Sequence, residues 1–170
     1  MKIRDAALED AVAACDVLSR SISELCAADH HNNPEILERW LANKTPEIIE
    51  SWITRMGNSV LLAVNGSSVL AVGAVTDDGE ITLNYVSPTV RFQGVSRALL
   101  RALEMRAIDR GNTRCRLNSS ETARRFYLSA GYTDDGPPVQ MFGTPSYPMS
   151  KRLSKSPLVE TLKVQVPGIR

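Results

Sequence analysis

The chain has 170 residues, of which 43% are hydrophobic and 23% charged, a balance typical of a globular domain of about 100–200 residues. Its longest uninterrupted apolar run, Val69 to Val75, is far shorter than the roughly 20 residues that span a membrane. The opening MKIRDAALED contains acidic residues and no apolar core, so we expect no secretory signal. The three cysteines, Cys15, Cys26 and Cys115, form no CxxC pair, which favours free thiols in the reducing cytoplasm.

The formal net charge is only +1, but the charges are unevenly distributed. Residues 1–80 hold thirteen acidic and six basic residues, whereas residues 91–130 hold nine arginines and three acids. A basic middle section favours contact with an anion, and an acidic first half favours a cationic partner. The alternative, that solvated helix faces merely differ in sign, stays open. We expect no nucleic-acid partner, because the arginines are spread over two helices and a strand with few interleaved aromatic residues.

The first third of the chain is predicted to be mostly helical. A short strand at residues 2–6 precedes a helix over 8–27, whose apolar residues recur at the helical period. A polar break follows at residues 29–33. Two further helices are expected to begin at Pro34 and Pro46, because each proline comes after a good capping residue.

The middle of the chain predicts three antiparallel strands at residues 60–64, 69–75 and 81–86. Asn65-Gly66 is a strong hairpin signal between the first two. Because these strands are apolar on both faces, helices are expected to cover both sides of the sheet.

A second pattern follows the meander: a helix over 94–110, a strand over 113–118, a helix over 121–130 and a last strand over 147–153. The strand 81–86, the helix and the strand 113–118 make a parallel β-α-β unit with a right-handed crossover. The fold class is therefore α/β, an α+β mixed sheet in one domain over 1–153. In the tail 154–170, the apolar stretch 158–166 could complete a neighbour's sheet, which leaves a homodimer open.

The segment from Tyr85 to Arg97 carries the clearest chemical signal. A strand ends there and a helix begins, and the unpaired N–H groups of a helix N-terminus bind anions. Gly94 allows a close approach to the backbone, and Arg91 and Arg97 add positive charge. Together these features suit a pyrophosphate, although the segment is neither a Walker loop nor a GxGxxG motif.

Two motifs then point to one family. Arg91-Phe92-Gln93-Gly94-Val95-Ser96 resembles the Gln/Arg-x-x-Gly-x-Gly/Ala signature of the GNAT superfamily of N-acetyltransferases. About 30 residues downstream, the segment from Ser120 to Tyr132 is similar to the Asn-x-x-Ala-x-x-x-Tyr motif of that family. The resemblance covers residues 1–153. It implies a GNAT-like fold and a direct, metal-independent transfer of an acetyl group from acetyl-CoA to a primary amine of a small molecule or protein.

The resemblance also implies roles for residues. Backbone amides from Gln93 to Arg97 would hold the pyrophosphate, Val86 would pair with the pantetheine arm between two splayed strands, and an amide near Tyr85 would polarise the acetyl carbonyl. Tyr127 would be the catalytic acid that protonates the departing thiolate. Ser96 and Ser120 depart from the usual Gly/Ala and Asn. The implied cofactor-binding set is Tyr85, Val86, Arg91, Phe92, Gln93, Gly94, Val95, Ser96, Arg97 and Ser120.

The family often carries a carboxylate base on its fourth strand, but this strand reads Ile-Thr-Leu-Asn-Tyr-Val. Asn84 can orient an amine but cannot take its proton. Candidate bases elsewhere are Glu24, His30 and His31, although adjacent histidines in a polar loop are usually only solvated. The resemblance places the acceptor cleft in residues 20–56 and 133–146, with Trp40, Trp52 and Phe142. The missing base keeps an alternative open, a non-catalytic acyl-CoA-binding regulatory module.

Overall fold

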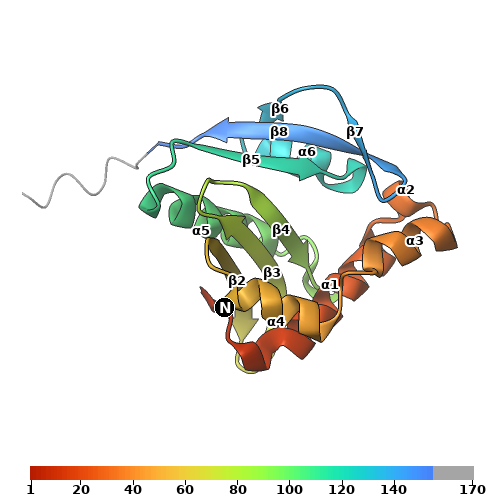
Figure 1. Ribbon diagram of the computed structural model, residues 1–170, viewed down its shortest axis with the longest axis horizontal. Coiled ribbons are helices and arrows are strands. Elements are labelled where there is room, and N and C mark those ends of the chain that lie inside the picture. The colour runs from red at the N-terminus through yellow and green to blue at the C-terminus, as the bar shows by residue number, and fades with distance from the viewer. Residues whose placement is uncertain (155–170) are drawn as a thin grey trace, which may run out of the picture.

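The computed structural model describes residues 1–154 of the chain (Figure 1). An antiparallel sheet has the strand order β1-β2-β3-β4. Its members, β1 (Lys2–Asp5), β2 (Asn58–Asn65), β3 (Ser68–Thr76) and β4 (Ile81–Val86), confirm the predicted meander and its hairpin turns.

Helices cover both faces of this sheet, as expected from strands that are apolar on both sides. On β2, Val60, Leu62 and Val64 pack in one core cluster with residues of α1 (Ala11–Leu25) and α4 (Pro46–Thr54). Leu61 and Ala63 pack in the other cluster with α5 (Val95–Asp109). Because alternate residues of a strand point to opposite faces, β2 is buried on both sides.

The close approach of α5 to the sheet depends on Gly73 of β3. A Cβ atom at this position would lie 2.8 Å from Leu103 Cδ1 and 3.1 Å from Leu99. A side chain here would therefore force Leu103 and Leu99, two buried leucines of α5, to move.

A second sheet has the order β5-β8-β6, with β7 paired to β8. These strands are β5 (Arg114–Ser119), β6 (Thr133–Asp134), β7 (Val139–Met141) and β8 (Thr144–Arg152), and α6 (Glu121–Ser129) packs on β5 and β8. The last strand therefore begins three residues earlier than the predicted 147, and it pairs antiparallel with β5.

The two sheets meet at one end only. A parallel bridge joins Glu80 to Arg116, and the Arg116 amide donates to the Gly79 carbonyl at 3.0 Å. Beyond this bridge β4 and β5 diverge (Figure 1). The parallel β-α-β unit predicted from the sequence is thus present, with the splay between its strands.

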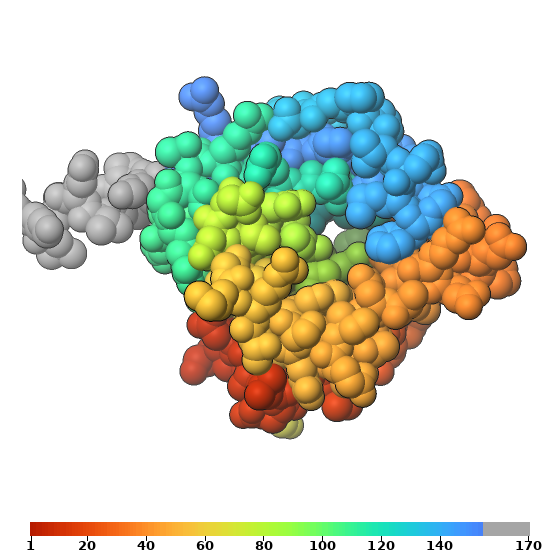
Figure 2. Space-filling view, viewed as in Figure 1, coloured from red at the N-terminus to blue at the C-terminus, as the bar shows by residue number. Residues whose placement is uncertain are grey.

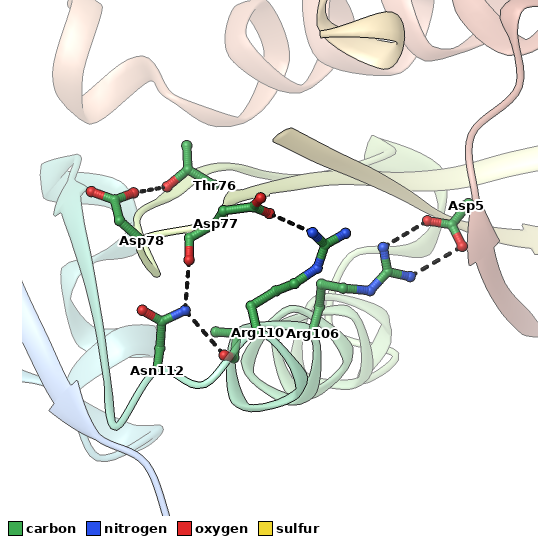
Figure 3. A network of polar contacts seen from close by, with 8 residues as sticks. Asp5, Thr76, Asp77, Asp78, Arg106, Arg110 and Asn112 are labelled. Atoms are coloured by element: carbon green, nitrogen blue, oxygen red, sulfur yellow. Dashed lines mark hydrogen bonds and ion pairs between the residues drawn. The ribbon is translucent and has the colours of Figure 1, made fainter. Parts of the chain in front are cut away.

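Ion pairs give most of the arginines in the basic section, residues 91–130, a structural role. Arg106 of α5 makes two hydrogen bonds to Asp5 of β1, and Arg110 pairs with Asp77 beside Asn112 (Figure 3). Three more arginines of the basic section pair with Asp135, Asp78 and Asp134. Five of its nine arginines therefore hold elements together. Within the described residues, the four without an ion pair are Arg91, Arg97, Arg101 and Arg125.

The predicted helix over 8–27 is wrong at both ends. A 3-10 turn, Leu8–Asp10, precedes α1, and α1 stops at Leu25. The expected polar break contains another short helix, α2 (Ala27–His30), in which Asp29 and His30 are buried. The helix predicted at Pro34 is α3 (Pro34–Leu41).

Within residues 1–154, no helix has both the length and the apolar character to cross a membrane. The predicted contact of residues 158–166 with a neighbour lies outside the described residues.

Candidate active site

A cleft of about 610 Å³ opens where β4 and β5 diverge. Figure 2 shows this hollow between the surfaces of β4, of the segment around residue 140, and of α3 and α4. Its lining includes three aromatic side chains expected at the acceptor cleft, Trp40, Trp52 and Phe142, with Trp40 stacked on Phe142 at 6.2 Å between ring centroids. Parts of the two segments 20–56 and 133–146 therefore line this cleft.

Four residues singled out from the sequence also line the cleft: Asn84 and Tyr85 on β4, and Ser120 and Tyr127 at α6. Trp40 Nε1 donates a hydrogen bond to the Tyr85 hydroxyl at 3.2 Å, which joins α3 to β4. Ser120 Oγ accepts from the Ala123 amide and so caps α6. The capping role gives a structural reason for a serine at this position.

Tyr127 is almost fully buried, with 7% of its surface exposed. Its ring packs edge-on against Phe126 and Tyr132, at 5.1 and 5.5 Å between centroids. Burial raises the pKa of Tyr127 to about 12, and the Asn84 side chain opposes that rise. The phenol is therefore protonated throughout the neutral pH range, so it can donate a proton but cannot serve as the base.

The helix that carries Tyr127 is anchored by Asp29. This carboxylate, only 1% exposed, accepts hydrogen bonds from the amides of Glu121 and Thr122 at 2.6 and 3.2 Å and from the Thr122 hydroxyl. A buried carboxylate at a helix N-terminus is favourable because it accepts from unpaired amides. Sequence reasoning missed this role, because Asp29 and its partners lie more than 90 residues apart.

A bulge gives β4 its open edge. Ala74 pairs with Leu83 and Val75 pairs with Ile81, so Thr82 has no partner on β3. Bulges bend a strand and increase its twist, and from this point on β4 leaves β5. The side-chain oxygen Asn84 Oδ1 is buried in the same stretch without a hydrogen-bond partner within the described chain.

The loop before α5 has the features expected of an anion site. Gly94 has φ +79°, a left-handed conformation that favours glycine, and the position of a Cβ there is open space. The first hydrogen bond of the helix runs from the Ala98 amide to the Gly94 carbonyl, so the amides of residues 95–97 precede the helical ladder. Arg91 stacks over the exposed ring of Phe92, and both lie at this loop.

The candidate bases do not lie in the cleft. Glu24 is exposed and pairs with Arg20, and His31 is exposed. The buried His30 uses both ring nitrogens, toward the Ile22 carbonyl and the Asn32 amide. The prediction that both histidines are solvated is therefore wrong for His30. Among the described residues that line the cleft, Glu80 is the one carboxylate.

The cysteines are free, as predicted. Burial raises the pKa of Cys26 to about 12 and that of Cys115 to about 11, so both remain thiols. In residues 1–154, no cluster of three or more His, Cys, Asp or Glu side chains could hold a metal ion.

Comparisons with known proteins agree with this geometry. Residues 27–153 match the family model described as an acetyltransferase (GNAT) domain. The chain therefore belongs to the GNAT family, and it is an acetyltransferase. No curated protein sequence matches it.

Solved structures share the fold. A GCN5-related N-acetyltransferase from Rhodopseudomonas palustris is 24% identical with a TM-score of 0.80, covering 89% of this chain and 95% of that one. The PaiA N-acetyltransferase from Thermoplasma acidophilum, in complex with coenzyme A, is 20% identical with a TM-score of 0.77, covering 89% and 98%. The protein yncA from Salmonella typhimurium, with its cofactor acetyl-CoA, is 20% identical with a TM-score of 0.68, covering 92% and 95%.

Proposed function

We propose that this protein transfers the acetyl group of acetyl-CoA directly to the primary amine of a small molecule or protein. Three features support the proposal: the glycine-started helix at Gly94, which follows β4 in the chain, the open edge of β4, and the aromatic cleft that Tyr85 of β4 and Tyr127 line. An extended, anionic donor fits along the first two and delivers its thioester to the third.

The donor would be held by main-chain groups and two arginines. The amides of residues 93–97 would bind the pyrophosphate, assisted by the guanidinium groups of Arg91 and Arg97, with Phe92, Val95 and Ser96 forming the rest of the loop. Arg97 already donates to the Ser129 side chain at 2.8 Å, which orients it beside α6. Val86 and the free backbone groups of β4 would pair with the pantetheine arm, and Ser120 would face it from α6.

In the reaction, the amine nitrogen attacks the thioester carbonyl carbon, a C–N bond forms, and the C–S bond breaks. An amide near Tyr85 would donate to the carbonyl oxygen as negative charge develops on it. The nitrogen gives up a proton, which we route to water because Asn84 cannot accept it. The sulfur leaves as a thiolate that accepts a hydrogen bond from the Tyr127 hydroxyl, and the proton that the nitrogen releases to water balances its charge.

The pKa values decide how Tyr127 contributes. A thiol ordinarily has a pKa of about 8.5, whereas burial raises the pKa of Tyr127 to about 12. Complete proton transfer from the phenol to the thiolate is therefore uphill. Tyr127 would act mainly by hydrogen-bonding the leaving sulfur as its charge grows.

The test combines donor binding with turnover. Acetyl-CoA at 100 times its dissociation constant should stabilise the protein by about 2.7 kcal/mol, and a panel of primary amines should release free thiol. Gly94→Glu should abolish the stabilisation by placing a carboxylate at the pyrophosphate site.

Gly111→Glu is the matched control, because Gly111 has φ +88° and open space around its Cβ position at the other end of α5. Both variants carry the same backbone strain, so only the first should lose the donor. A Gly94→Glu protein that is folded and binds coenzyme A as tightly as the wild type would refute the donor site. Stabilisation by acetyl-CoA without thiol release to any amine would favour the alternative, a regulatory acyl-CoA-binding module.

A further inference from the structure

The cleft contains a buried lysine that the proposed reaction does not use. Lys44 lies in the loop between α3 and α4 and is only 8% exposed. Its ammonium donates to the Trp40 carbonyl at 3.2 Å and to Asn43 Oδ1. It also lies over the rings of Trp52 and Phe142, at 5.8 and 5.7 Å from their centroids. These contacts place a positive charge inside the aromatic part of the cleft.

This charge has no counter-ion within residues 1–154, where none of the eight ion pairs involves Lys44. An ammonium buried without a carboxylate is costly, and burial lowers the pKa of Lys44 to about 8. Few charges surround it. Arg55 is a second cation on the cleft wall, and Glu80 is a carboxylate on that wall but forms no ion pair with Lys44 within residues 1–154. Cys15 Sγ donates to the Lys44 carbonyl at 3.0 Å and opposes part of the fall in the Lys44 pKa.

A second polar group without a partner lies on β4. Asn84 Oδ1 is buried, belongs to a cleft residue, and accepts no hydrogen bond within the described chain. An amine N–H would satisfy it, and the effect of Asn84 on the pKa of Tyr127 places this amide beside the proposed acid. The cleft therefore offers an acceptor atom next to the reaction centre and a cation at Lys44.

We propose that Lys44 binds a carboxylate of the acceptor, so that the preferred substrates are amines that also carry a carboxylate, joined by an apolar or aromatic body. The inference rests on the proposed function. Asn84 receives the amine N–H, the rings of Trp40 and Phe142 contact the body, and Lys44 supplies the counter-charge. The acidic first half of the chain had favoured a cationic acceptor, but the charges that line the cleft favour an anionic group.

Matched acceptors that differ only in the carboxylate test the proposal. 4-(Aminomethyl)benzoate with benzylamine is one pair, and 6-aminohexanoate with hexylamine is another. In Lys44→Met, KM for the carboxylate-bearing member should rise about 10- to 100-fold, the range of a charge-assisted hydrogen bond. KM for its partner should change less than about 2-fold. Lys44→Arg should retain the preference, and Lys2→Met, at an exposed lysine, should change neither.

A purely structural role for Lys44 would give another result. The ammonium bonds to the Trp40 carbonyl near the end of α3, so its loss could disturb the aromatic wall as a whole. Lys44→Gln keeps a donor but removes the charge. If Lys44→Met and Lys44→Gln change both members of each acceptor pair equally, the carboxylate site is refuted.

A binding measurement without acetyl transfer separates this inference from the proposed function. The probe is 3-phenylpropionate, which has the ring and the carboxylate but no amine, and the fluorescence of Trp40 and Trp52 reports its binding. Because a carboxylate binds protonated Lys44, affinity in the wild type should fall above pH 8.

Each outcome has one meaning. Binding of 3-phenylpropionate that is lost in Lys44→Met supports the carboxylate site. No binding, or equal binding to the variant, overturns it even if amines are acetylated. Binding with no thiol release to any amine supports the site and refutes the proposed transfer.

Discussion

Replacing Asp29 should loosen the helix that presents Tyr127. The carboxylate is buried and accepts three hydrogen bonds from the first turn of α6. Asp29→Asn keeps the shape but turns one oxygen into an NH2 group that faces an N–H donor. The variant therefore loses the charge and at least one hydrogen bond. Asp29→Ala loses all three and leaves the amides of Glu121 and Thr122 without a partner.

The magnitude follows from the bonds that are lost. A hydrogen bond to a charged group is worth about 1.5–3 kcal/mol, so Asp29→Asn, which loses one, should cost about 2 kcal/mol, and Asp29→Ala, which loses three, at least about 4.5 kcal/mol. For a domain of this size, each kcal/mol lowers the melting temperature by about 2–4 °C. Asp29→Asn should therefore melt roughly 4–8 °C below the wild type.

Thermal unfolding followed by circular dichroism measures this difference. Asp16→Asn is the control, because Asp16 is an exposed carboxylate on α1. Thiol release should also decrease in Asp29→Asn, since fraying of α6 displaces the Tyr127 hydroxyl. If the Asp29 and Asp16 variants melt within about 1 °C of each other, then Asp29 does not anchor α6, and the reasoning from its hydrogen bonds is wrong.

Three further predictions follow from the structure. Tyr127→Phe should lower kcat about 100-fold, whereas the acetyl-CoA dissociation constant, measured by calorimetric titration, should change less than about 2-fold. An unchanged kcat would show that Tyr127 takes no part in the reaction. Lys151→Met should lower the free energy of unfolding in urea by about 3 kcal/mol, because it leaves the buried Glu104 carboxylate without the ammonium that contacts it at 2.9 and 3.0 Å. A loss below about 1 kcal/mol would contradict this reasoning. Arg106 holds the pKa of Asp5 below its usual value, so the stability this pair adds is present above about pH 4 and is lost at lower pH. Asp5→Asn should cost under about 1 kcal/mol at pH 7 and nothing at pH 2, whereas a loss that persists at pH 2 would refute the electrostatic origin.

Local patterns were enough to predict much of this fold. The hairpin at Asn65-Gly66, the capping residues before Pro34 and Pro46, and the apolar runs of the meander act over a few residues. So does Gly94, whose small size and left-handed backbone mark the start of α5. These features predicted the loop before α5, the meander and its helical layers from the sequence alone.

Contacts between residues far apart in the sequence could not be predicted from such local patterns. The burial of Asp29 and His30 depends on α6 and β8, which follow about 90 and 115 residues later. From its local sequence alone, a polar run such as residues 29–33 is predicted to be a solvent-exposed loop. The burial of Lys44 could not be predicted either, because it depends on Trp52 and Phe142, which come from different segments of the chain and pack around its side chain. The ion pairs of the basic section likewise join residues as distant as Asp5 and Arg106.

The divergence of β4 from β5 has a consequence for the protein when no donor is bound. A strand that is paired on one side only exposes a row of amides and carbonyls, and such a row can recruit a strand from any other chain. The donor's amide-bearing arm would occupy the same row. Coenzyme A should therefore act as a solubility factor, and preparations stripped of it should self-associate more readily on concentration than those that retain it.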